Sequence, residues 1–203
     1  MNWTGVRRIT YLFLEINMHD AADDLPHSLI IYDTEYTSWQ GSQERGWSGA
    51  REFQELVQIG AIHIIRRGSE YYIARSIDIL MRPERNPILS QYFVDLTGIE
   101  QCDVDDGMSI MEGLRVFKEF ADSDMCYSYG NDYDIIEKNL DLVDVSDDDP
   151  LRKWKEMHFD IRKVLDHYVD TSKYTSGEVY RGFTIEDLPL RVHNALQDCY
   201  SIL

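Results

Sequence analysis

Leu29-Ile30-Ile31-Tyr32-Asp33-Thr34-Glu35-Tyr36-Thr37 is the stretch of this chain that says most about its fold. Its apolar run, rich in β-branched and aromatic residues, predicts a buried strand. Asp33 and Glu35 lie two residues apart at the end of this run, so their side chains share one face of the strand. Burial strengthens the repulsion between two such carboxylates, and a divalent cation such as Mg²⁺ or Mn²⁺ would relieve it. The alternative is two solvated acids where a strand meets a loop.

Length and composition restrict the classes of protein that the chain can belong to. The 203 residues suit one α/β domain with a small appendage, and no apolar run approaches the roughly 20 residues of a membrane span. The net charge of −17 argues against a non-specific duplex binder, which needs a basic surface. The 3 cysteines lie far apart without metal-ligand spacing, so we expect a reducing cytoplasm.

The remaining pattern predicts a mixed sheet with helices packed on it. Alternating residues over 56–65 and 71–81, joined by a polar turn, predict two more strands that form an antiparallel meander with the strand at 28–37. Helices are expected at 89–96, 109–121, 131–142, 161–168 and from 195 onward, short strands at 125–129 and 158–160, and a last apolar piece at 183–190. We expect residues 1–27 to be an N-terminal extension and 28–203 to be the domain.

A Gly/Ser-rich loop at 38–52 carries Trp39, Trp47, Arg45 and Arg51. Tryptophans beside arginines are typical of surfaces where nucleic-acid bases stack and phosphates pair. The alternative is that both tryptophans anchor the loop on the core.

Two later motifs add polar groups at the ends of secondary-structure elements. Asp134 falls in the first turn of the helix predicted after Gly130, where the helix dipole favours an anion. Near the end of the chain, Asn194 followed by Gln197 predicts a helix that begins at Ala195 and carries Asp198. His193 would then lie on the preceding loop, close to Asp198, with a pKa suited to accepting a proton from water. Alone, each motif has a structural explanation as a helix cap or a buried histidine.

Taken together, the motifs resemble those of the DEDDh 3′–5′ exonucleases, which include the proofreading subunit of bacterial DNA polymerase III, ribonuclease T and oligoribonuclease. They appear here as Asp33-Thr34-Glu35, Tyr133-Asp134 and His193-Asn194-Ala195-Leu196-Gln197-Asp198, with supporting matches at 57–61, 96–99 and 159–161. The resemblance covers about residues 28–203. It implies a ribonuclease H-like fold, a mixed five-stranded sheet whose first three strands form the antiparallel meander.

The resemblance also implies a chemistry and a role for each motif residue. Asp33, Glu35 and Asp198 would hold the metal that carries the attacking water, and Asp33 with Asp134 would hold a second. Two Mg²⁺ or Mn²⁺ ions would act together in phosphodiester hydrolysis, with His193 as general base. Nucleoside 5′-monophosphates would be released from a 3′ end.

The expected partner is a single-stranded DNA or RNA 3′ end or a short oligonucleotide, because the acidic surface disfavours long duplexes. No membrane partner is expected, and a homodimer is left open. The candidate substrate-binding residues are Tyr36, Thr37, Trp39, Arg45, Trp47 and Asn131.

Three alternatives to this interpretation are kept. An oligoribonuclease-like enzyme that trims RNA differs only in loop geometry, which governs contacts to the 2′-hydroxyl. A binding module could keep the fold without turnover. An acidic Ca²⁺-binding or scaffold protein would rest on runs such as Asp147-Asp148-Asp149, which lack the spacing of a calcium loop.

Overall fold

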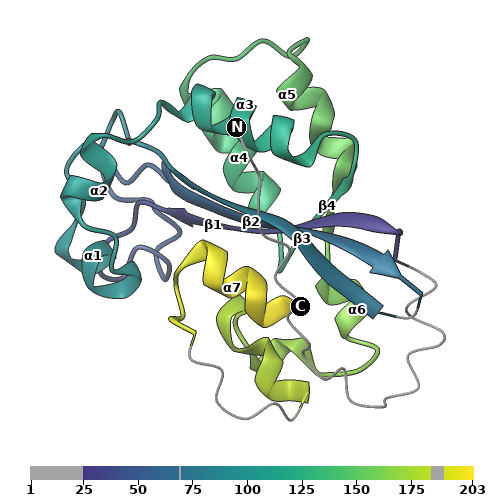
Figure 1. Cartoon of the computed structure of the whole chain (residues 1–203). Coiled ribbons are helices and arrows are strands. Elements are labelled where there is room, and N and C mark those ends of the chain that lie inside the picture. The colour runs from purple at the N-terminus through teal and green to yellow at the C-terminus, as the bar shows by residue number, and fades with distance from the viewer. Residues whose placement is uncertain (1–24, 69, 184–189) are drawn as a thin grey trace.

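A computed structural model describes residues 25–68, 70–183 and 190–203. Its centre is a five-stranded sheet of order β3-β2-β1-β4-β5, in which β3, β2 and β1 are antiparallel and β1, β4 and β5 are parallel (Figure 1). The strands are β1 Ser28–Tyr36, β2 Leu56–Arg67, β3 Glu70–Leu80, β4 Met125–Ser128 and β5 His158–Asp160. This topology confirms the predicted ribonuclease H-like fold and its antiparallel meander.

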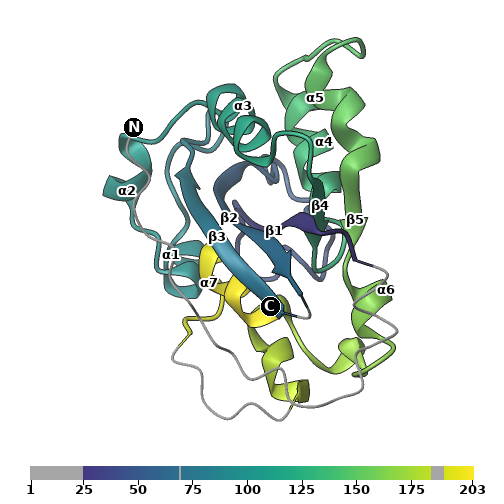
Figure 2. The same ribbon diagram turned by 45° about the vertical axis from the view of Figure 1, so that its right-hand side comes forward.

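Helices cover both faces of the sheet. On one face lie α3 (Ile110–Ala121), α4 (Asp132–Leu142) and the short α5 (Pro150–Lys153) (Figures 1 and 2). On the other lie α6 (Arg162–Leu165), the 3₁₀ segment η3 (Ser176–Phe183) and the C-terminal α7 (Ala195–Ile202). Two further short helices, α1 (Gln91–Thr97) and α2 (Gln101–Asp105), lie beyond one end of the strands.

The side chains of β1 alternate between two separate cores. Ile30 and Tyr32 pack with the α3 and α4 face, whereas Leu29 and Ile31 pack with the face covered by η3 and α7. Because the period is two residues, Asp33 and Glu35 follow Leu29 and Ile31 onto the α7 face. The alternation of one strand therefore directs both carboxylates towards the last helix.

Close packing at one glycine sets the position of α7. Gly60 of β2 pairs with Asp33 of β1, and a Cβ atom added to Gly60 would lie 2.1 Å from the backbone nitrogen of Leu196. The backbone of α7 therefore rests directly on the sheet beside β1. This contact brings Asp198, one turn into α7, next to the carboxylates of β1.

Several predicted element boundaries differ from the structure. The helix expected at 89–96 begins at Gln91, because the side chain of Ser90 accepts a hydrogen bond from the amide of Phe93 and caps it. The helix expected at 161–168 covers only Arg162–Leu165, and α2, α5 and the 3₁₀ segments were not predicted. Within the described residues, no helix has the length and apolar character that a membrane crossing requires. Residues 1–24 of the expected extension and 184–189 of the expected apolar piece lie outside the described residues.

Candidate active site

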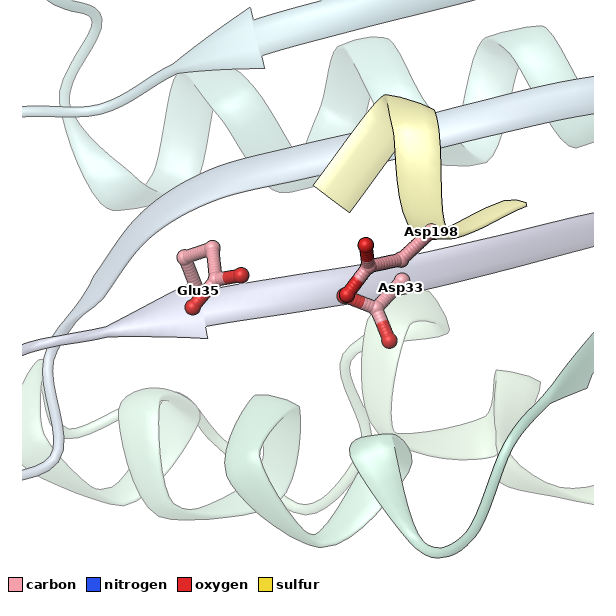
Figure 3. Close-up of side chains that lie close together, drawn as sticks. All are labelled: Asp33, Glu35 and Asp198. Atoms are coloured by element: carbon pink, nitrogen blue, oxygen red, sulfur yellow. The ribbon is translucent and has the colours of Figure 1, made fainter. Parts of the chain in front are cut away.

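Three carboxylates meet where β1 ends and α7 begins. Asp33 and Glu35 come from β1, Asp198 comes from α7, and one carboxylate oxygen from each lies within 4.8 Å of the others (Figure 3). Asp33 and Asp198 are buried. The predicted convergence of the first and last motifs is therefore present in the folded chain.

The loop before α7 and the segment η3 hold Asp198 in place. The side chain of Asn194 accepts a hydrogen bond from the amide of Gln197, which is the cap expected for a helix beginning at Ala195. Oδ2 of Asp198 accepts a hydrogen bond from the hydroxyl of Ser176 at 3.1 Å. Oδ1 of Asp198 is buried and has no hydrogen-bond partner among the described residues. A buried carboxylate oxygen without a donor is suited to a cation.

A fourth carboxylate belongs to Asp132, the first residue of α4. Thr34 of β1 donates a hydrogen bond to Oδ1 of Asp132 at 2.6 Å, which ties the helix start to the strand that carries Asp33. Asp134, which the sequence motif favoured, is exposed, although it also lines the pocket. Two residues along a helix turn a side chain by about 200°, so only one of the two aspartates can face β1. The hydrogen bond from Thr34 of β1 therefore goes to Asp132, while both aspartates line the pocket.

Burial, and after it the repulsion between these carboxylates, raises their pKa values. Burial, together with the charges of Asp132 and Asp198, raises the pKa of Asp33 well above its usual value. Burial and the charges of Asp198 and Asp132 raise the pKa of Glu35 to about 8. Burial also raises the pKa values of Asp132 and Asp198 to about 6. Oxygen donors crowded in this way fit a divalent metal ion, whose charge would favour their ionised forms.

His193 lies on the loop before α7 and lines the same pocket as the four carboxylates. Its φ of 64° is a left-handed backbone conformation that is uncommon for residues other than glycine. Burial lowers the pKa of His193, and the charge of Glu178 partly opposes this shift. The imidazole is therefore neutral near pH 7 and able to accept a proton.

The predicted substrate-binding residues divide into two groups. Tyr36, Trp47 and Asn131 line the pocket. The ring of Trp47 lies 5.5 Å from that of Tyr36, and its Nε1 donates to the carbonyl of Thr37 at 3.1 Å. The other three predicted residues, Thr37, Trp39 and Arg45, do not line the pocket. The hydroxyl of Thr37 is bound to the carbonyl of Phe53, and Arg45 pairs with Glu52 within the loop.

Sequence reasoning missed several residues of the pocket wall. These are Leu96, Tyr92, Lys138, Tyr129, Arg162 and Ser176. They come from five separate segments, and only the packing of those segments around the sheet reveals that they share one pocket. Their sequence neighbourhoods contain no common spacing that would have grouped them.

Carboxylates gathered on a mixed five-stranded sheet, with a histidine before the last helix, form the arrangement that the resemblance to the DEDDh exonucleases implies. The RNase_T exonuclease family matches residues 30–203, and the chain belongs to this family.

Individual relatives agree with this assignment. ERI1 exoribonuclease 2 of Xenopus laevis is 32% identical over 92 residues, which are 45% of this chain and 12% of that protein. The human protein of the same name is 29% identical over 89 residues, 44% of this chain and again 12% of the relative, so only a small part of either relative is matched. The nuclease domain of 3′hExo, a DEDDh family member bound to rAMP, superimposes with a TM-score of 0.66 at 20% identity, covering 87% of this chain and 88% of that one. Cell-death related nuclease 4 gives 0.65 at 18% identity, covering 87% and 61%.

Proposed function

We propose that this protein is a 3′–5′ exonuclease that hydrolyses the terminal phosphodiester of a single-stranded nucleic acid and releases a nucleoside 5′-monophosphate. The observation that carries the proposal is the convergence of Asp33, Glu35 and Asp198 in one pocket with His193. RNA is the first substrate to test, because the curated relatives are named exoribonucleases.

The carboxylates divide between two proposed metal sites. Asp33, Glu35 and Asp198 would hold one ion, and Asp33 with Asp132 would hold the other, in place of the Asp134 expected from the sequence motif. Two Mg²⁺ or Mn²⁺ ions bound there would stabilise negative charge on the entering and leaving oxygens of the displacement. Ser176 donates to Asp198 and so keeps that side chain directed into the pocket.

His193 is proposed as the general base. A ring nitrogen of the neutral imidazole takes the proton of the attacking water, and the nearby charge of Glu178 stabilises the imidazolium that results. The left-handed backbone at His193 places the ring on the pocket side of the loop before α7. The segment from His193 to Asp198 would thus supply the base and one of the acidic ligands.

The shape and chemistry of the pocket favour a single strand. Tyr36, Trp47 and Tyr92 form aromatic surface beside the carboxylates, and such surface stacks on unpaired bases of any sequence. Tyr92 is 39% exposed, which leaves its ring accessible to a base. The net charge of −17 disfavours a long duplex.

A gel time course tests the proposal. The substrates are 5′-labelled single-stranded RNA, single-stranded DNA and a blunt duplex, each with Mg²⁺, Mn²⁺ or EDTA, and Asp33→Ala is the control. A metal-dependent ladder that shortens from the 3′ end of single strands, and that Asp33→Ala abolishes, is the expected result. Binding of these strands without any cleavage would contradict the proposal and point to a silent binding module of the same fold.

A further inference from the structure

Among the described residues, Lys138 of α4 and Arg162 of α6 are the only lysine or arginine side chains that line the pocket. Lys138 is already engaged, because its Nζ donates to Oε1 of Gln54 at 2.6 Å. Arg162 lies at the end of β5. A phosphodiester strand bound in so acidic a pocket needs cationic donors, so the geometry of Arg162 decides whether it can provide them.

Arg162 is held rigidly by its neighbours. Its Nε donates to Oδ1 of Asp160 at 3.0 Å and its Nη2 donates to Oδ2 at 2.7 Å, in a bidentate pair. The guanidinium also lies 5.8 Å from the centre of the Tyr129 ring. Oδ1 of Asp160 accepts a further hydrogen bond from the amide of Gly130, which anchors the pair to the turn before α4. An arginine fixed in this way loses little conformational entropy when it binds a ligand.

One edge of the guanidinium remains available. Within the described part of the chain, Nη1 of Arg162 makes no hydrogen bond, and the side chain is 40% exposed. Because Asp160 offsets the charge, recognition would come from the fixed N–H donors, whose planar array matches phosphate oxygens.

The sheet topology separates Arg162 from the carboxylates along the pocket. The strands β1, β4 and β5 are parallel neighbours, so their carboxyl ends lie at the same edge of the sheet. Asp33 and Glu35 belong to β1 and Arg162 follows β5, two strand positions away, which corresponds to about 10 Å. A nucleic acid cleaved at the carboxylates would therefore place the neighbouring nucleotide beside Arg162.

We propose that Arg162 is a substrate-binding residue whose Nη1 edge holds the phosphate next to the one that is cleaved. The proposal rests on the proposed exonuclease function. It predicts that Arg162 acts on substrates that possess a second phosphate and has no part in the chemical step.

Substrate length provides the test. The substrates are an adenosine dinucleotide, which has one phosphodiester, and a single-stranded adenosine decamer. The proteins are the wild type, Arg162→Ala, Arg162→Lys and the matched control Lys163→Ala, which removes an exposed cation that does not line the pocket. We expect Arg162→Ala to raise KM for the decamer about tenfold, because one charge-assisted hydrogen bond to the substrate is lost. The value of kcat for the decamer should not change. Dinucleotide kinetics should stay at the wild-type values, and Arg162→Lys should recover part of the decamer KM.

Salt dependence adds a second readout. Because Asp160 offsets the charge of Arg162, losing this contact should reduce the slope of log affinity against log salt by less than the value of about 0.7 expected for an unpaired cation on a single strand. An unchanged decamer KM, or an equal loss on both substrates, would overturn the proposal, and the second result would place Arg162 at the cleaved phosphate. If the wild type cleaves neither substrate, the proposed function fails. Fluorescence anisotropy on the decamer then still tests Arg162, because weaker binding by Arg162→Ala than by Lys163→Ala remains the expected result.

Discussion

At the scale of single residues, Asp132 and Asp134 make the sharpest comparison in the molecule. Both begin α4 and both line the pocket, but only Asp132 accepts the hydrogen bond from Thr34 and shares charge repulsion with Asp33. We expect Asp132→Asn to lower kcat about 10²-fold or more, because it removes a metal-ligand charge and leaves the shape of the side chain. Asp134→Asn should change kcat less than about threefold. Single-turnover cleavage of 5′-labelled RNA measures both, and a larger loss for Asp134→Asn would restore the assignment made from the sequence motif.

His193 supports a prediction about pH. Burial lowers its pKa below the ordinary 6.5, so activity should fall as the pH drops through this lowered value and the imidazole gains a proton. Because the charge of Glu178 raises the pKa of His193, Glu178→Gln should move the acidic limb of the kcat profile to lower pH. His193→Ala should abolish that limb and reduce kcat about 10²-fold, with metal binding intact by calorimetry. Wild-type turnover in His193→Ala would remove the histidine from the mechanism.

At the scale of elements, the contact between β2 and α7 supports the site mechanically. Gly60→Ala would place a methyl carbon against the backbone of Leu196, which cannot move without shifting Asp198 on the same helix. We expect a loss of about 1 to 3 kcal/mol in the free energy of unfolding, and a larger loss of activity than the unfolded fraction explains. Gly46→Ala is the control, since its φ of 60° strains the backbone but its Cβ would meet open space. Chemical denaturation and kinetics on both variants distinguish a displaced helix from ordinary backbone strain, and full activity in folded Gly60→Ala would contradict the prediction.

Elements also show how far sequence reasoning reaches. Strict alternation in β1 sufficed to place Asp33 and Glu35 on one face, and the cap at Asn194 sufficed to place Asp198 on a helix. Both depend only on residues that are close in the sequence. The third acid depends on where α4 starts after the turn at Gly130, whose φ of 115° no local pattern specifies. The pairing of Arg45 with Glu52 inside the loop could not be predicted for a similar reason, because it is a contact between residues of a non-repeating segment.

At the scale of the whole molecule, the crowded carboxylates make stability depend on pH. The pKa values of Glu35, about 8, and of Asp132 and Asp198, about 6, exceed the values near 4 of an unfolded chain. These groups bind protons more tightly in the folded state, so they cost nothing below about pH 4. Their cost grows as the pH rises through the folded values. The metal-free protein should therefore lose thermal stability between pH 5 and pH 8, and Mn²⁺ should restore more of it at pH 8 than at pH 5.

Replacing one acid separates this local effect from the general repulsion of a protein with a net charge of −17. Glu35→Gln removes the carboxyl whose pKa is raised to about 8, so at pH 8 in EDTA it should stabilise the protein by about 1 to 2 kcal/mol while abolishing activity. Glu44→Gln makes the same change in net charge at an exposed loop position and should leave the free energy of unfolding within about 0.5 kcal/mol of the wild-type value. Differential scanning fluorimetry at both pH values measures the three proteins. If Glu35→Gln and Glu44→Gln melted at the same temperature at pH 8, the loss of stability would be due to the overall net charge and not to the carboxylates of the site.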